Sequence, residues 1–517
     1  MSNKNRLKSG GRIDRLTKIN FLFNGKKYSG FKGDTLASAL IANDIKVIAR
    51  SFKYHRPRGI IGVGVEDPAS LIELLGDDAS GNNLTTTVLL KEGLEVKSIN
   101  CWPSVNFDLG AITQMFARFI PAGFYYKTFK WPTWHLFEPS IRKAAGLAAA
   151  PENPPKTGHY ESRNSHCDVL IIGAGLAGLI STLMAGRAGA RVILVDQNSE
   201  AGGHLLNSKI HINDNAGLDW VSKVVEEIAK MPNVIHMQNS TAWAYREHNL
   251  VIVNQREIND SPIIERSWRI RTKKTVIATG AMERALVFSN NDRPGVMLAS
   301  AIQGYINRYA VKPGNDVVIF TNNDSAYHCV QDFLDSDINV VAIVDTRSEI
   351  SQKILATVPD IKIFTGAVIK NIIGYKKVKS VVIESTIDQK LQTISCDLVA
   401  HSGGWNPTIH LHSQSRGTVR FDENIAAFVP DKNVQNSSVI GAANGSFVFS
   451  KIVGETQEIV KEIVSDLNLN SKFKDSIESK DYSYSIQPFW HTSLSNKKTK
   501  HFLIFKMMLP LMTFTWH

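Results

Sequence analysis

The feature that most constrains the fold is the run at residues 167–197, CDVLIIGAGLAGLISTLMAGRAGARVILVDQ. A buried strand, a glycine turn, a helix and a second strand are expected in this order, which is one βαβ unit. The turn holds Gly173, Gly175 and Gly178, and Asp196 ends the second strand. In such a fingerprint the glycines allow a tight turn, close approach to a pyrophosphate and helix–strand packing, while the acid binds ribose hydroxyls. We therefore predict an adenine-dinucleotide site, with NAD or FAD favoured over NADP; a glycine-tolerant tight turn is the alternative.

Two further glycine segments fit the same site. Residues 201–204 read AGGH just after the second strand, so Gly203 would let that loop pass close to a cofactor. The run TVIATG, which ends at Gly280, would return a strand beneath the same ligand, and the small residues 441–445 would abut it at a helix start. Together these segments predict an FAD/NAD-type nucleotide domain.

A second α/β unit is expected at about residues 314–400. It opens with the strand-like run DVVIF and closes with VVAIVD, but its turn, TNNDSAYHCV, lacks the glycine fingerprint. We interpret this unit as structural. Tyr327 and His328 in its turn could be core residues or could line a cleft, and the sequence does not decide between them.

The N-terminal region predicts a small mixed module. Residues 17–65 alternate apolar and polar positions around an Asn24-Gly25 turn, and GDTLASALIANDI follows as a short helix capped by Asp34 or Thr35. The polar stretch RSFKYHRPRG must then be a loop. The fold class that we predict is therefore α/β: a β-grasp ferredoxin-like module followed by a two-dinucleotide-binding (Rossmann) domain.

The net charge of +11 is local rather than general. Residues 1–60 hold 14 Lys and Arg against 3 Asp and Glu, and the rest of the chain is balanced. The basic loop at residues 50–59 interleaves aromatics with cations, so a nucleic-acid patch, a solvated basic face, and a phosphate or flavin at a subunit contact are all open. We favour the last and expect no nucleic-acid partner.

The four cysteines exclude several chemistries. No two of them have CxxC spacing, so a disulfide framework, a metal site or a dithiol redox centre is not expected. The start of the chain has no apolar signal region, and the apolar tail at residues 502–514 is too short to span a bilayer. We expect a soluble cytoplasmic protein without a membrane partner.

Six motifs in this order resemble one family. They are GDTLASAL, RSFKYHRPRG, GAGLAG, ATGAMERALVFSNNDRPGVMLA, SGGWNPT and GAANG. The chain resembles the alpha subunit of heterotetrameric sarcosine oxidase from about Gly11 to Phe502. The resemblance implies oxidative demethylation of sarcosine to glycine, with hydrogen peroxide and formaldehyde or methylene-tetrahydrofolate as products. It implies FAD in the beta subunit, FMN at the alpha–beta contact, NAD in the alpha subunit without a redox role, and beta, gamma and delta partners.

The resemblance also implies a set of cofactor-binding residues, while the sequence does not identify the catalytic residues. Residues expected around the NAD, besides Gly203 and Gly280, are Ala174, Asp196, Gln197, Asn198, His204, Ala242, Ala442 and Phe447. Leu176 stands where the family often has Pro, and His204 replaces a small hydroxyl residue. The N-terminal module resembles ferredoxin-like domains of related amine dehydrogenases, in which cysteines fill the loop that reads YHRPRG here, so a cluster is not expected. An alpha-like subunit of an opine or proline dehydrogenase, and a non-catalytic nucleotide-binding scaffold, are the alternatives.

The end of the chain departs from the family pattern. Where the family continues into a folate-binding domain, this chain reads HFLIFKMMLPLMTFTWH. We predict a single-base frameshift near residue 503, which would make a lone truncated chain inactive. The expected divisions are a module without cluster cysteines at 1–100, an aromatic-rich connection at 101–165, the nucleotide domain at 166–465, a link at 466–502 and a frameshifted tail at 503–517.

Overall fold

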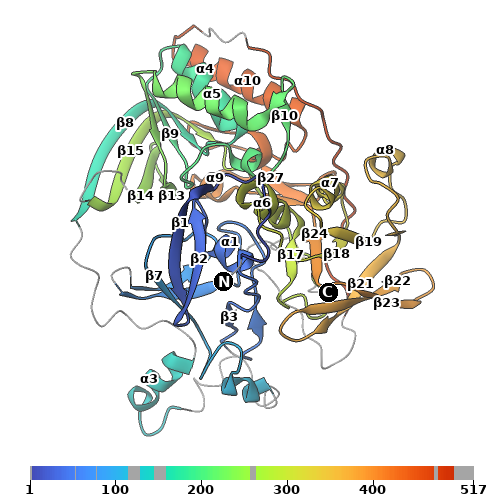
Figure 1. Ribbon diagram of the computed structural model, residues 1–517. Coiled ribbons are helices and arrows are strands. Elements are labelled where there is room, and N and C mark those ends of the chain that lie inside the picture. Colours follow the sequence, from blue (N-terminus) through green and yellow to red (C-terminus); the bar gives the residue numbers. More distant parts are fainter. Residues whose placement is uncertain are drawn as a thin grey trace.

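Three main sheets organise the chain (Figure 1). A computed structural model describes residues 3–52, 54–76, 79–114, 129–144, 159–256, 263–470 and 475–493. The predicted frameshifted tail and parts of the aromatic-rich connection, residues 115–128 and 145–158, lie outside these residues. Among the described residues, no helix is both long and apolar enough to cross a membrane.

The N-terminal domain is a mixed sheet with one helix packed against it. Asn24 and Gly25 both have positive φ, +52° and +74°, as a tight hairpin turn requires, so the predicted hairpin is confirmed. The helix begins after Thr35, whose side chain accepts the N–H of Ser38, and it is buried throughout. The sheet order is β2-β1-β7-β5-β6, and the elements are β1 (Asp14–Phe23), β2 (Lys26–Lys32), α1 (Leu36–Ala42), β5 (Leu71–Leu74), β6 (Ser80–Leu84) and β7 (Leu94–Ser98).

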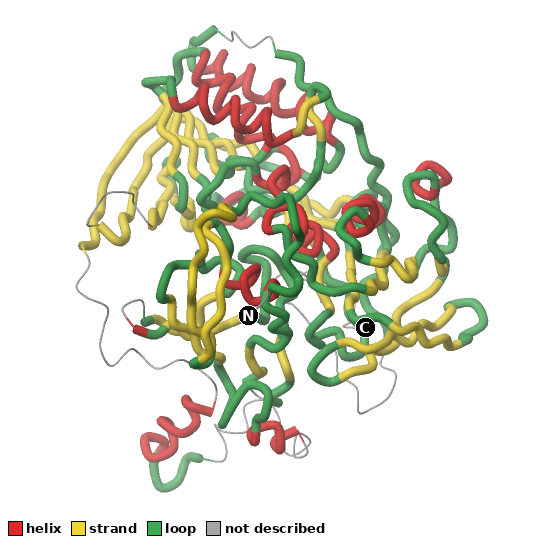
Figure 2. Tube along the Cα trace, in the orientation of Figure 1, coloured by secondary structure: helices red, strands yellow, loops and turns green. Residues whose placement is uncertain are grey.

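The second sheet carries the predicted βαβ unit. Its order is β12-β9-β8-β15-β14-β13, with β28 parallel to β15. Helices α4, α5 and α10 cover one face, which Figure 2 shows as the red group above the yellow strands. The elements are β8 (His159–Ile172), α4 (Leu176–Arg187), β9 (Val192–Val195), α5 (Gly217–Ala229), β12 (Val234–Met237), β13 (Ser240–Arg246), β14 (Leu250–Arg256), β15 (Ile263–Ile277), β28 (Ser437–Val439) and α10 (Phe449–Asp466).

One predicted boundary is wrong. The sequence places the start of the nucleotide domain at residue 166, but β8 already begins at His159 and pairs in parallel with β15. The early part of β8 is polar and mostly exposed, so it lacks the apolar pattern that marks a buried strand. Its partner strand, rather than its own sequence, defines it.

The second α/β unit is larger than expected. Its parallel sheet runs β17-β24-β18-β19-β20, and β17 with helix α6 precedes residue 314. The elements are β17 (Val296–Leu298), α6 (Ala299–Tyr309), β18 (Asp316–Thr321), α7 (Val330–Leu334), β19 (Asn339–Asp345), β20 (Ile363–Phe364), β21 (Ala367–Gly374), β22 (Val378–Ser385), β23 (Leu391–Ser395) and β24 (Leu398–Ser402).

Short elements join these units. Strand β16 pairs with β25 where the chain crosses between the two nucleotide-type sheets. The remaining elements are β3 (Ala49–Arg50), β4 (Pro57–Arg58), η2 (Leu109–Gln114), α3 (Trp134–Ala144), η4 (Gly203–Leu206), β10 (His211–Ile212), β11 (Asn215–Ala216), β16 (Ala281–Glu283), η5 (Tyr327–Cys329), α8 (Gln352–Leu355), β25 (Trp405–Pro407), α9 (His410–Gln414), β26 (Val419–Asp422), β27 (Ala427–Pro430) and η6 (Gly441–Asn444).

Candidate dinucleotide site

The turn between β8 and α4 accepts only glycine at two positions. Gly173 has φ +106°, and a Cβ there would lie 2.3 Å from the carbonyl oxygen of Ala278. A Cβ on Gly178 would lie 1.8 Å from the carbonyl oxygen of Gly173. Because neither position has room for a side chain, the start of α4 sits directly against the strand ends. Gly175 caps α4, which leaves the first N–H groups of the helix facing the turn.

Asp196 connects the end of β9 to this turn. Its Oδ2 accepts the backbone N–H of Ala174 at 2.6 Å, and its Oδ1 accepts both the backbone N–H of Asn198 and the side-chain amide of Asn198. The Asp196 side chain is 7% exposed, whereas Gln197 is exposed. The carboxylate is therefore held in place at the crevice, and Oδ2 retains a lone pair for a ligand hydroxyl.

The Gly-Gly loop lies against the same helix start. The N–H of Gly202 donates to the carbonyl oxygen of Ala174 at 2.8 Å, and a Cβ on Gly203 would lie 2.9 Å from the Cα of Gly175. His204 follows on η4, is exposed, and meets Trp405 edge to face at 5.8 Å between ring centroids. The loop therefore packs directly on the glycine turn and the start of α4.

Three more of the expected residues lie in later segments of the chain, one at the end of the TVIATG run and two at residues 441–447. Gly280 has φ +72°, and its carbonyl oxygen accepts the N–H of Thr408 at 2.9 Å. Ala442 lies in η6 and Phe447 lies in the loop that leads from η6 to α10, and both are half-buried. Glu455 holds that loop by accepting the N–H of Gly441, the amide of Asn444 and the hydroxyl of Ser446. Gly441 touches α4, since a Cβ there would lie 3.0 Å from that of Ala177.

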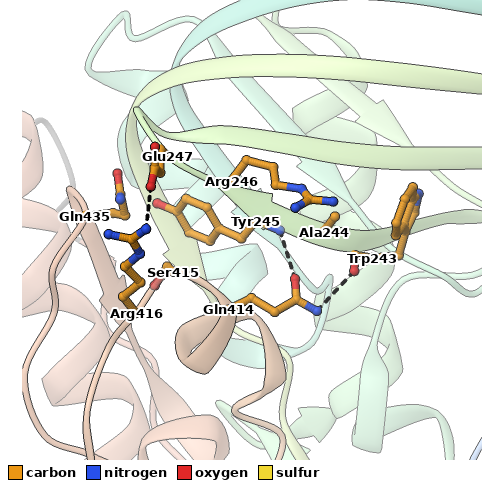
Figure 3. Close-up of a pocket in the computed structure, with 9 residues that line it drawn as sticks. All are labelled: Trp243, Ala244, Tyr245, Arg246, Glu247, Gln414, Ser415, Arg416 and Gln435. Carbon is orange, nitrogen blue, oxygen red and sulfur yellow. Dashed lines mark hydrogen bonds and ion pairs between the residues drawn. The ribbon is translucent and has the colours of Figure 1, made fainter.

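Ala242 lies on β13, which starts beside Asp196 because the N–H of Ser240 donates to the carbonyl oxygen of Asp196 at 2.8 Å. Beyond Ala242 the strand lines an open surface groove of about 590 Å³ (Figure 3). Gln414 accepts the N–H of Tyr245 and donates to the carbonyl of Trp243, and Arg416 pairs with Glu247. The groove is lined by β13 and the α9 region rather than by glycine turns, so it is separate from the crevice.

Two consecutive buried charged residues, Glu283 and Arg284, follow Gly280 and were not predicted from the sequence. Glu283 is 3% exposed, and burial raises its pKa to about 7, although the backbone N–H and hydroxyl of Ser300 both donate to it. Burial also lowers the pKa of Arg284 to about 10; its guanidinium bonds Asn406 and the Ala426 carbonyl and lies 4.5 Å from the Trp490 ring centroid. Their position inside the apolar run AMERALVF was a signal in the sequence that two charged side chains are buried here, because charged residues are rarely buried without a specific partner.

The carboxyl end of β18 is covered by the chain itself. We call residues 481–492 the C-terminal strap. The N–H of Asp324 donates to the carbonyl of Ser485 at 3.1 Å, and the N–H of Gln487 donates to that of Asn322 at 3.0 Å. Asp345, at the end of β19, pairs with Arg347 and accepts the hydroxyl of Tyr327. The second unit therefore presents no open strand ends at the place where the first unit has its crevice.

The basic loop at residues 50–59 is a junction inside the molecule, closed by the short strands β3 and β4. Arg56 and Arg58 both bond Asp292, Arg56 through Nε at 2.6 Å and Arg58 through Nη1 at 2.8 Å. Arg50 donates to the carbonyl of Val105 and to the hydroxyl of Tyr375. Arg50 is 2% exposed and Arg56 is 6% exposed, so the alternative of a solvated basic face is wrong.

This arrangement, with glycine turns and an acid at the ends of parallel strands, defines a dinucleotide-binding domain. The chain belongs to the pyridine nucleotide-disulphide oxidoreductase family, whose model matches residues 167–439. A second model, described as a 2Fe-2S iron-sulfur cluster binding domain, matches residues 17–101. The predicted fold class, a ferredoxin-like module followed by a dinucleotide-binding domain, is confirmed.

The residues of the N-terminal domain do not fit an iron–sulfur cluster. Such a cluster takes four cysteine thiolates, or two with two histidines, and Cys101 is the one cysteine among residues 17–101. Within the described ranges, no three His, Cys, Asp or Glu side chains are grouped so that they could hold a metal ion. His55, in the loop where related domains carry cysteines, bonds Asp108 at 2.8 Å.

The chain is similar to sarcosine oxidase alpha subunits, which confirms the resemblance. It is 40% identical over 514 residues to the sarcosine oxidase alpha subunit of Rhizobium meliloti (strain 1021), covering 97% of this chain and 51% of that protein. It is 34% identical over 456 residues to the protein of the same name from Corynebacterium sp. (strain U-96), covering 84% of this chain and 42% of that protein. The chain thus spans about half the length of the curated relatives that it matches, and an oxidoreductase role is supported.

Two further similarities are weaker, one in sequence and one in fold. An opine oxidase subunit of Agrobacterium tumefaciens (strain Ach5) is 26% identical over 184 residues, covering 35% of this chain and 37% of that protein. The crystal structure of L-proline dehydrogenase from P. horikoshii superposes with a TM-score of 0.62 at 18% identity, over 91% of this chain and 77% of that chain. The latter similarity shows a common fold for most of the chain.

Proposed function

We propose that this chain is the nucleotide-binding portion of a sarcosine oxidase alpha subunit. The observation that carries the proposal is the similarity to that subunit over 97% of the chain, which includes the dinucleotide crevice. In the proposed complex, sarcosine is demethylated oxidatively to glycine, with hydrogen peroxide and formaldehyde or methylene-tetrahydrofolate as products. The lone chain is inactive in this proposal, because no residue in it is assigned to the chemistry.

The crevice would hold NAD. The N–H groups at the start of α4 would receive the pyrophosphate, and the free lone pair of Asp196 would accept a ribose hydroxyl. Gln197, Asn198, His204, Ala242, Ala442 and Phe447 would border the ligand. In this proposal bound NAD has no redox role, as the resemblance to sarcosine oxidase alpha subunits implies.

A flavin-bearing beta subunit would contact the N-terminal domain, with FMN at the contact and FAD in the beta subunit. Phe52, Trp102 and Phe107 are 61%, 68% and 66% exposed. They lie in loops that are joined by the His55–Asp108 bond, and a group of exposed aromatics on one support is typical of a partner surface. Gamma and delta subunits, and a cytoplasmic location, belong to the same proposal.

Two measurements test the function. The nucleotide that co-purifies with the chain is identified by absorbance and mass, and colourless protein with NAD is expected; a yellow, FAD-loaded chain would overturn the NAD assignment. Sarcosine-dependent oxygen uptake is then measured for the chain alone and with a beta-type subunit. No uptake is expected from the chain alone, and turnover by it would refute the assignment.

The second candidate is an alpha-like subunit of an opine or proline dehydrogenase. The match to the opine oxidase protein and the fold shared with L-proline dehydrogenase favour it. Supplying octopine or proline in place of sarcosine to the same reconstituted complex separates the two. If no substrate is turned over but the nucleotide binds, the chain acts as a nucleotide-binding scaffold.

A further inference from the structure

Four aromatic rings from four separate segments form one chain of contacts. His204 meets Trp405 edge to face at 5.8 Å, and Phe447 meets Tyr484 at 4.8 Å with an angle of 61° between the rings. The two pairs are joined because the backbone N–H of Trp405 donates to the hydroxyl of Tyr484 at 3.2 Å. Only His204 and Phe447 were expected at the nucleotide site.

Each ring is attached to a segment that borders the dinucleotide crevice. His204 follows Gly203, which packs on Gly175 at the start of α4. Trp405 begins β25, which pairs with β16 immediately after Gly280. Phe447 follows the glycine loop that rests on α4. His204, Trp405 and Phe447 therefore belong to segments next to the glycines of the predicted site, and Tyr484 joins them through its contacts with Trp405 and Phe447.

A dinucleotide has two ring systems on either side of its pyrophosphate. With the pyrophosphate at the start of α4 and the adenosine ribose at Asp196, the second ring system extends toward Gly203 and Gly280. A planar ring stacks well on aromatic side chains, and Trp405 and Phe447 are both partly exposed there. The aromatic chain is thus placed where the second ring of the ligand would lie.

Tyr484 belongs to the C-terminal strap, not to the nucleotide domain. After this residue, the N–H of Asp324 donates to the carbonyl of Ser485 and the N–H of Val287 donates to the carbonyl of Trp490. Before it, the hydroxyl of Ser483 donates to the carboxylate of Asp324. The packing is close: a Cβ on Gly404, which has φ +85°, would lie 2.7 Å from the Tyr484 hydroxyl. Partial burial with this close packing fixes the ring between Trp405 and Phe447.

We propose that Tyr484 is a positioning residue of the nucleotide site, which holds Trp405 and Phe447 against the second ring of the bound dinucleotide. This inference rests on the proposed nucleotide binding. Since Tyr484 is carried by the strap, nucleotide binding stabilises the docked strap, and the docked strap increases nucleotide affinity by the same factor.

The strap supplies its own matched control. Tyr482 lies two residues earlier and packs on His328 of the second unit at 4.7 Å between ring centroids. Tyr482→Ala therefore removes the same side chain from the same strap without touching the aromatic chain. Tyr484→Phe keeps the stacking and removes only the hydroxyl.

The test measures NAD affinity by calorimetry for the full chain and these variants, together with hydrogen exchange of residues 482–492. Tyr484→Ala should weaken NAD binding about 3- to 10-fold, and Tyr482→Ala should change affinity less than about 2-fold. Tyr484→Phe keeps the ring contact with Phe447 but loses the bond to Trp405, so its affinity should lie between those of Tyr484→Ala and the wild type. Adding NAD should slow exchange in the strap of the wild-type chain.

The outcomes separate this inference from the proposed function. If the wild-type chain binds no NAD, the proposed function fails. If the wild type binds NAD while Tyr484→Ala and Tyr482→Ala bind equally well, or the strap exchanges at the same rate with and without NAD, the role of Tyr484 is refuted. A thermal melt without ligand identifies any variant that fails to fold, and the exchange measurement on the wild type still decides the question.

Discussion

The backbone N–H of Ala174 donates to Oδ2 of Asp196 at 2.6 Å, so the acid that ends β9 is bonded directly to the glycine turn that ends β8. The two parts of the dinucleotide fingerprint are therefore one hydrogen-bonded unit before any ligand arrives. A change at Asp196 should consequently affect both the stability of the turn and the affinity of the site.

Asp196→Asn should lower both the stability of the chain and its affinity for NAD. The amide nitrogen cannot accept a hydrogen bond, and a bond to a charged acceptor contributes about 1.5–3 kcal/mol to stability. We expect the free energy of unfolding in urea to fall by about 2 kcal/mol and the NAD dissociation constant to rise about 10-fold or more. Asp168→Asn is the control, because Asp168 pairs with Arg191 away from the crevice; equal affinity losses in both variants would contradict a specific role.

Gly178→Ala and Gly454→Ala should have opposite effects. A Cβ on Gly178 would lie 1.8 Å from a backbone oxygen, so α4 must shift, and we expect a loss of about 2–4 kcal/mol together with loss of nucleotide binding. Gly454, in the interior of α10, has no atom within 4 Å of such a Cβ. Alanine there should stabilise the chain by about 0.5–1 kcal/mol. Urea unfolding measures the free energy of unfolding of both variants. If both variants lose the same amount of stability, the turn at Gly178 does not specifically require glycine.

Glu283 should give the chain a measurable pH dependence. Its pKa is raised by burial from 4.5 to about 7, so between these values the folded chain holds a proton that the unfolded chain has released. The free energy of unfolding therefore falls as pH rises through this window. Glu283→Gln keeps an acceptor for Ser300 and does not titrate, so it should gain up to about 3 kcal/mol over the wild type by pH 8 and almost nothing at pH 4.5. If the free energies of unfolding of the wild type and Glu283→Gln differ by the same amount at every pH from 4.5 to 8, Glu283 does not titrate in this way.

Asp292→Asn should be among the most damaging single changes at the domain junction. Asp292 is 4% exposed and is the carboxylate that both Arg56 and Arg58 bond. Removing one partner from a buried ion pair leaves uncompensated charge and costs about 3–5 kcal/mol. Thermal unfolding should show the loss, and limited proteolysis should show earlier cleavage of the N-terminal domain. The exposed Asp388→Asn serves as control; a melting temperature for Asp292→Asn equal to that control would exclude the junction role.

Anaerobic reconstitution with iron and sulfide should leave the N-terminal domain without a cluster. One cysteine among residues 17–101 cannot supply four thiolates. Iron and sulfide analysis after desalting should find neither in stoichiometric amount, with a plant-type ferredoxin as positive control. A bound cluster would mean that ligands come from outside this domain.

The parts of the fold that follow local patterns were predictable. The strand–turn–helix at Gly173, the hairpin at Asn24 and the helix after Thr35 each depend on neighbours within a few residues, and each is present. The start of β8 at His159, in contrast, could not be predicted from neighbouring residues. The early part of β8 is polar, and only its pairing with β15, about a hundred residues later, makes it a strand.

The site shows the same division. Glycines and Asp196 could be found because their spacing has a direct physical cause. Tyr484 and Trp405 could not, because their contact joins residues 79 positions apart whose local sequence carries no nucleotide signal. The burial of the basic loop could not be predicted for a related reason. The partner of Arg56 is Asp292, and sequence spacing does not reveal this contact.

The Arg56–Asp292 bond joins positions 236 residues apart, and this separation has a consequence for synthesis. At about 5–20 residues per second, the ribosome needs about 12–47 s after Arg56 to reach its partner. Throughout that interval the N-terminal domain carries two guanidinium groups without the carboxylate that later neutralises them. Nascent chains should therefore complete this domain late, only after residue 292 has emerged from the ribosome.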